Sequence, residues 1–185
     1  MEDLIRFKFD IKEVGIAVAK FLIGSANDEE EEFELTNICD PIGDLLRGLV
    51  QMLQKFQSGT DEENIYHITW YNDNECFNWA LTLANDGQLN VQITESNSFF
   101  GDEIFEAVNT TCSVSAFIKA IVTELDSYIK RVGLLRYLEL WGGNNEFPIT
   151  YLIYLKKYLM DIGQWPDDAK QNDGLLSSEC QLIVD

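Results

Sequence analysis

The chain has 185 residues, of which 46% are hydrophobic, and it carries 32 Asp and Glu against only 13 Lys and Arg. This apolar content excludes a disordered acidic chain, because it can bury enough surface to offset the entropy of ordering. The formal net charge of −19 argues against direct binding to nucleic acid or to an anionic membrane, since both require a basic patch.

Three strands are predicted before residue 40. Apolar and polar side chains alternate over residues 5–11, which is typical of a strand with one buried face. Residues 14–23 are more uniformly apolar, which indicates a central strand covered on both faces. After turn-forming residues at 24–28, residues 30–38 read as the returning strand, with Phe33 and Leu35 on one side.

A helix is predicted over residues 41–56. Asp40 is suited to cap its free N–H groups, and Pro41 fits the first helical position, where no donor is needed. Apolar residues then recur at helical spacing as far as Phe56, and Gly59 ends the pattern. We expect this helix to cover a sheet.

Further strands are predicted over residues 65–71, 76–83 and 89–94, joined by turns at 72–74 and 85–87. Residues 96–108 show no clear period, and we expect a loop there with one helical turn around residues 103–107. Three more helices follow by the same reasoning. The first runs from Ser113 to Gly133, the second covers residues 134–141, and the third runs from Pro148 to Gly163.

The predicted fold is α+β, an antiparallel sheet of about six strands with helices packed mainly on one face. Strand, turn, strand and helix follow one another over residues 14–56 and again over 76–132, so the sequence also admits two ββα units. We assign residues 1–163 to a single domain and residues 164–185 to a polar C-terminal segment. Within that segment, Leu182, Ile183 and Val184 could add an edge strand or fray.

Motifs for catalysis or cofactor binding are absent. The glycine patterns that bind phosphate, the nucleophile elbow and the EF-hand loop are all missing from the sequence. The single histidine, His67, could approach Cys76 from a neighbouring strand, although a structural role is the simpler interpretation. The four cysteines show no C-x-x-C pair and are expected to be mostly reduced. We therefore predict no catalytic residue, metal or cofactor, with a hydrolase built on paired carboxylates as the alternative.

A continuous acidic run is the sharpest local feature. It consists of Asp28, Glu29, Glu30, Glu31 and Glu32. The functional interpretation is a landing site for Lys and Arg of a partner. The alternatives are a solvated hairpin turn that discourages aggregation and a loose site for a divalent cation. Trp141, beside two glycines, is the tryptophan that we expect on the surface, where it would serve as an anchor.

Several stretches resemble small acidic bacterial immunity proteins, which neutralise polymorphic toxins and toxins of contact-dependent inhibition systems. The resemblance is one of general character. It lies in the hairpin leading into the helix over 41–56, in residues 79–83 running into 85–87, and in residues 140–143 followed by Phe147 and Pro148. It implies a non-catalytic protein that binds and inhibits a basic partner.

The expected function is therefore that of an acidic, immunity-type or inhibitor-type domain that binds a basic protein. The N-terminal sequence lacks the pattern of a signal peptide, and no apolar run approaches the roughly 20 residues that span a bilayer. Both observations favour a cytoplasmic location without membrane binding. The alternatives are the carboxylate hydrolase and a structural or regulatory domain whose charge serves only solubility.

Overall fold

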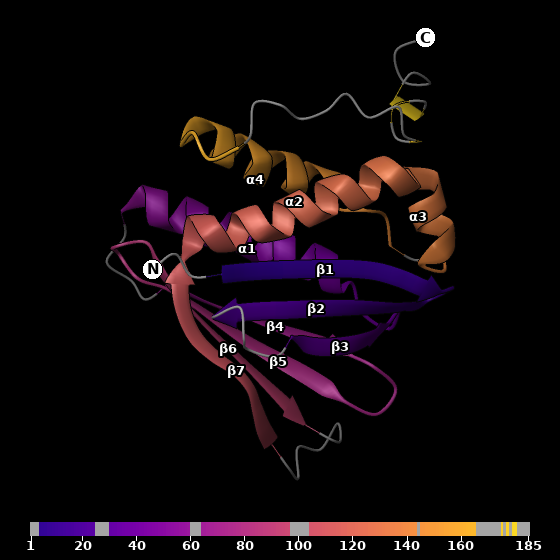
Figure 1. The fold of residues 1–185 in the computed structure, drawn as a ribbon, viewed down its shortest axis with the longest axis horizontal. Coiled ribbons are helices and arrows are strands. Elements are labelled where there is room, and N and C mark those ends of the chain that lie inside the picture. Colours follow the sequence, from indigo (N-terminus) through magenta and orange to yellow (C-terminus); the bar gives the residue numbers. More distant parts are fainter. Residues whose placement is uncertain are drawn as a thin grey trace.

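The computed structural model describes residues 4–24, 30–59, 64–96, 104–143 and 145–165, together with Leu175, Ser177, Glu179 and Cys180. Within these residues the chain forms an α+β fold with seven strands and four helices (Figure 1). The first antiparallel sheet has the order β1(Leu4–Glu13), β2(Ile16–Gly24), β3(Glu31–Thr36). The second has the order β4(Asn64–Tyr71), β5(Cys76–Leu83), β6(Gln88–Ser96), β7(Ile104–Ser113).

The predicted α+β class is confirmed, but the prediction of one sheet of about six strands is wrong. The strands form two sheets of three and four strands, because β3 leads into a helix instead of pairing with β4. A strand's two-residue period shows which face is buried, and it does not show whether that face meets a helix or a second sheet. Each sheet is followed by a helix, so the chain reads as three strands and a helix, then four strands and a helix, rather than as two ββα units.

The four helices gather on one side of the two sheets (Figure 1). Their bounds are α1(Pro41–Ser58), α2(Val114–Val132), α3(Leu134–Leu140) and α4(Ile149–Asp161). The long helix α1 packs on β4, α2 packs on β1, and α4 contacts both helices. Each long helix therefore covers the first strand of the sheet to which it is not directly joined, which ties the two halves into one unit. None of the described helices is both long and apolar enough to cross a bilayer.

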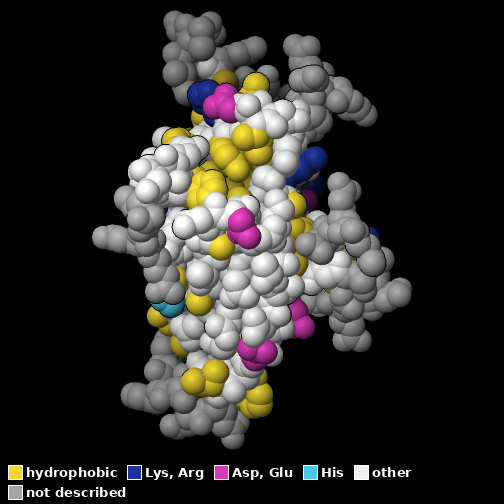
Figure 2. Space-filling view, turned by 90° about the vertical axis from the view of Figure 1, so that its left-hand side faces the viewer, with side chains coloured by type: hydrophobic (Ala, Val, Ile, Leu, Met, Phe, Trp, Pro, Cys, Tyr) yellow, Lys and Arg dark blue, Asp and Glu magenta, His cyan; other side chains and the backbone are white. Residues whose placement is uncertain are grey.

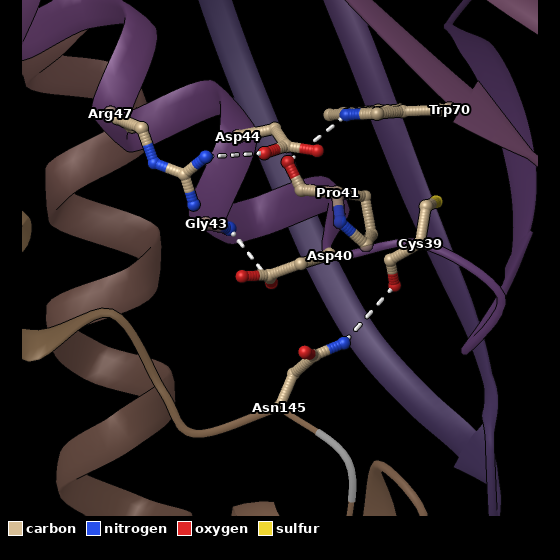
Figure 3. A network of polar contacts seen from close by, with 8 residues as sticks. All are labelled: Cys39, Asp40, Pro41, Gly43, Asp44, Arg47, Trp70 and Asn145. Carbon is tan, nitrogen blue, oxygen red and sulfur yellow. Dashed lines mark hydrogen bonds and ion pairs between the residues drawn. The ribbon is translucent and has the colours of Figure 1, made fainter.

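The first helix begins and ends as its sequence predicts. An oxygen of the Asp40 carboxylate accepts a hydrogen bond from the Gly43 N–H at 3.0 Å (Figure 3). At the other end Gly59 has a φ of 65°, which glycine adopts without strain. The Trp70 indole Nε1 donates to the carbonyl oxygen of Pro41 at 3.0 Å and so fixes the start of α1 to β4.

Aromatic side chains from both sheets fill the space between them. The ring centroids of Trp70 and Trp79 lie 4.4 Å apart, and that of Phe21 lies 5.0 Å from Trp79. Phe33 of β3 contacts Phe77 of β5 at 5.0 Å. All five side chains are buried. Tilted and edge-to-face aromatic contacts therefore hold the two sheets together.

Strand β7 occupies the region for which we predicted a loop with one helical turn. It pairs with β6 along its whole length, and a register shift leaves Ala107 as a bulged residue. The bulge breaks the alternation of buried and exposed side chains. The outer residues of this edge strand are also largely exposed, so the sequence carries little hydrophobic period that could reveal a strand.

Beyond α4 the chain still contacts the folded unit. Trp165 packs against the core, and the Lys156 ammonium lies 4.7 Å from the centroid of its ring. The carboxylate of Glu179 accepts hydrogen bonds from the N–H groups of Leu134 and Leu135, at 2.5 and 3.0 Å. The predicted edge strand of Leu182, Ile183 and Val184 lies outside the described residues.

Candidate partner-binding site

The acidic run lies at the start of β3. Asp28 and Glu29 are outside the described residues, Glu30 immediately precedes the strand, and Glu31 and Glu32 are its exposed first residues. Glu32 forms an ion pair with Lys20 of β2 on the outer face of the sheet. The alternation of the strand places Glu31 on the other face, the same face as the buried Phe33.

Trp141 does not lie on the surface, and the prediction that it serves as an exposed anchor is wrong. The side chain is fully buried. Its backbone N–H donates to the Tyr137 carbonyl at 2.8 Å, and the following Gly142 and Gly143 have φ values of 78° and 74°. The glycines form a tight turn at the end of α3, which Asn37 also approaches with a hydrogen bond to the Trp141 carbonyl. The tryptophan is thereby directed into the core rather than to solvent.

A row of side chains crosses the inner face of the second sheet from the core to its edge. The strand register pairs Trp70 with Phe77, Phe77 with Glu95, and Glu95 with Phe105. The first two side chains are buried, Glu95 is partly buried, and Phe105 is 52% exposed. The core-facing side of this sheet therefore ends in an exposed aromatic side chain at its edge. Ile104, the residue before Phe105 on β7, is 68% exposed and points to the opposite face of the strand.

Two carboxylates from other segments, Glu75 before β5 and Glu31 of β3, lie near enough to Glu95 for their charges to act on it. Partial burial raises the pKa of Glu95, and the negative charges of Glu75 and Glu31 raise it further. Glu75 is oriented by a hydrogen bond from the Asn72 side-chain amide at 2.6 Å. We call Glu31, Glu75 and Glu95 the acidic cluster, and Ile104 with Phe105 the β7 apolar pair.

Figure 2 shows hydrophobic and acidic side chains next to one another on the surface at the lower end of the molecule. This end is where the free ends of β6 and β7 lie in Figure 1. An aromatic anchor with a polar rim around it is a common arrangement in protein-binding surfaces. The arrangement can supply both an apolar anchor and attraction for cations.

The raised pKa of Glu95 predicts a pH-dependent stability. A carboxylate whose pKa is higher in the folded state binds its proton more tightly there. Its contribution to the free energy of unfolding is therefore fully present below the ordinary pKa, and it is lost as the pH rises through the pKa of the folded state. We expect Glu95→Gln to raise the free energy of unfolding at pH 7 by about 0.5 kcal/mol, a small amount because solvent screens the site. Urea titrations of both proteins at pH 7 and at about pH 4 measure the difference.

The gain from Glu95→Gln should disappear at the lower pH, where wild-type Glu95 is itself protonated. Glu146→Gln is the matched control, because Glu146 is exposed and outside the acidic cluster. It removes one negative charge without relieving the cluster. An equal gain in the two variants at pH 7 would assign the effect to net charge alone.

The residues considered for nucleophilic catalysis do not converge. His67 is exposed and pairs with Ala80, whereas Cys76 pairs with Tyr71, four residues and therefore about 13 Å further along β4. Burial raises the pKa of the Cys39 thiol to about 11, so this cysteine is not activated as a nucleophile. Among the described residues, no group of three or more His, Cys, Asp or Glu side chains could hold a metal ion.

Comparison of the chain with protein-family models, with curated proteins and with solved structures found no match.

Proposed function

We propose that the protein binds a basic partner protein, as an inhibitor-type or immunity-type domain, through the acidic cluster and the β7 apolar pair. The observation that carries the proposal is the direct pairing of the exposed Phe105 with Glu95, a carboxylate already opposed by the charges of Glu75 and Glu31. A Lys or Arg of the partner would stabilise the ionised form of this carboxylate, because the cation offsets the repulsion from Glu75 and Glu31. Phe105 offers apolar area beside it.

The acidic run extends this surface along β3. Glu30 and Glu31 are exposed at the start of the strand, and Glu31 belongs to the acidic cluster. In this mechanism the carboxylates enter a cationic cleft of the partner, such as one that binds nucleic acid, and the β7 apolar pair is buried against its rim. The charge accelerates association, and the apolar contact slows dissociation.

The carboxylate hydrolase is the second candidate, and the raised pKa of Glu95 is the observation that favours it. A general acid needs a raised pKa, and a neighbouring ionised carboxylate could serve as base or nucleophile. The two functions differ in their response to Glu95→Gln. This change removes the proton donor of a hydrolase and abolishes turnover, whereas it leaves most of the charge of a binding surface in place.

Affinity capture from lysate of the native cell, at about 0.05 M and about 0.5 M salt, tests the binding function. We expect mass spectrometry to identify a basic protein that is retained at low salt and weakened at high salt. A double variant, Glu30→Lys with Glu31→Lys, should lose most of the capture. The matched control is Glu139→Lys with Glu146→Lys, two exposed residues outside the site.

The control pair changes the net charge by the same amount, so it separates a local surface from the overall field. Equal losses in the two double variants would contradict a site at β3. Recovery of no basic protein at either salt would leave the net charge as a solubility feature and would overturn the proposal.

A further inference from the structure

A groove runs between the first half of β1 and the first half of α2, with a volume of about 1120 Å³. In Figure 1 the two elements lie side by side along the upper edge of the first sheet. The helix contributes short side chains to the groove, namely Ser115, Ala116, Ala120 and Thr123. The segment that follows α4 closes one part of it with Gly163, Gln164 and Trp165. The short side chains leave room for a segment of polypeptide.

The wall of the groove is the outer edge of the first sheet. Among the strands that the structure describes, β1 pairs with β2 alone, so none of them lies on its other side. Near the C-terminal end of β1, the Ile11 backbone N–H faces the Tyr128 hydroxyl of α2, so the outward-pointing backbone groups include those of Ile11. In an antiparallel pair, the backbone N–H and C=O groups of every second residue point away from the partner strand. The register continues unbroken from Ile11 back to Leu4, which places the N–H groups of Ile5 and Phe7 toward the groove.

Three exposed cations line the groove in a protein that has few. They are Arg6 and Lys8 of β1 and Lys119 of α2, against one acidic residue, Glu124. Within the described part of the chain, none of the three cations has an ion pair with an Asp or Glu. An anionic segment would therefore find positive charges and backbone donors that no described residue pairs with.

We propose that this groove binds an extended acidic peptide segment of another protein, which adds as a strand to the free edge of β1. Main-chain hydrogen bonds to Ile5 and Phe7 would supply affinity, and the cations would select an acidic sequence. A second copy of the chain fits less well, because pairing two β1 edges sets cation against cation and brings two charges of −19 together. The site is separate from the proposed function, since no residue of the acidic cluster lines it.

The test uses a short fluorescein-labelled peptide in which Val and Glu alternate, with fluorescence anisotropy as the readout. We expect saturable binding that Lys8→Glu weakens by about fivefold to tenfold, because an attraction becomes a repulsion. Lys12→Glu is the matched control, on the same strand but outside the groove, and should leave binding within about twofold. A peptide with proline at alternate positions should not bind, since it lacks the N–H groups that pair with the strand.

Amide hydrogen exchange locates the peptide on the protein. The amides of Ile5 and Phe7 should exchange more slowly with peptide present, whereas those of Arg6 and Lys8, which face β2, should change little. Absence of saturable binding, equal binding of the proline peptide, or equal effects of Lys8→Glu and Lys12→Glu would each overturn the proposal. Capture of a basic partner by the Lys8→Glu variant would be unaffected, so the two proposals fail separately.

Discussion

Replacing Trp70 with alanine is expected to lower the free energy of unfolding by about 3–5 kcal/mol. The side chain is fully buried between the sheets, in ring contact with Trp79 and Phe33, and its Nε1 donates to the Pro41 carbonyl. One side chain thus joins β4, β3 and the start of α1. Urea denaturation followed by circular dichroism, with linear extrapolation, measures the loss.

Two phenylalanine variants separate packing from hydrogen bonding. Trp79 is also buried, but its Nε1 has no hydrogen-bond partner within the described residues. Trp70→Phe removes the indole hydrogen bond to the Pro41 carbonyl and should cost about 1 kcal/mol more than Trp79→Phe, which removes no such bond. Equal costs would show that the bond to Pro41 adds nothing, and a loss below about 1 kcal/mol for Trp70→Ala would contradict the packing role.

Local chemistry made most elements predictable from the sequence. The start of α1 is determined by Asp40 and Pro41, and its end by Gly59, all within a few residues of the boundary that they set. The alternation of Phe77, Trp79, Leu81 and Leu83 likewise gave the bounds of β5 and its buried face. Short-range rules suffice where each residue's partner lies within one turn or one hairpin.

The division into two sheets depends on partners that are distant in the sequence. Phe33 meets Phe77, and each strand shows the same alternation whether it faces a sheet or a helix. β7 was missed because an edge strand with exposed side chains and a bulge at Ala107 has no clear period. Tertiary pairing with β6, rather than propensity, makes it a strand.

The site was predictable only in part. The acidic run identified Glu31 by charge, but Glu75 and Glu95 stand alone in the sequence and reach it only through the fold. One signal was present: Leu89, Val91 and Ile93 alternate, and continuing that alternation by one step places Glu95 on the core-facing side. The position of Trp141 was predicted wrongly because the two glycines after it suggested an exposed loop. With their positive φ values these glycines instead form a tight turn, and the Trp141 side chain is buried.

Replacing Phe105 with serine is expected to weaken the affinity for the captured basic partner by about 30-fold, or about 2 kcal/mol, the size typical of an aromatic anchor. The effect should lie mainly in a faster dissociation rate, because an apolar contact does not steer the encounter. Surface plasmon resonance with the purified partner, at low and high salt, separates the two rates. Stability should change little, since the side chain is 52% exposed in the free protein.

Ile153→Ser is the matched control, because Ile153 is 59% exposed on α4, away from the acidic cluster. It removes a similar exposed apolar side chain and should leave both rates unchanged. The Glu30→Lys, Glu31→Lys variant should instead slow association and flatten its dependence on salt. If Phe105→Ser and Ile153→Ser behave alike while the charge variant still acts, the partner is recognised by charge alone, and the β7 apolar pair has no part in the interface.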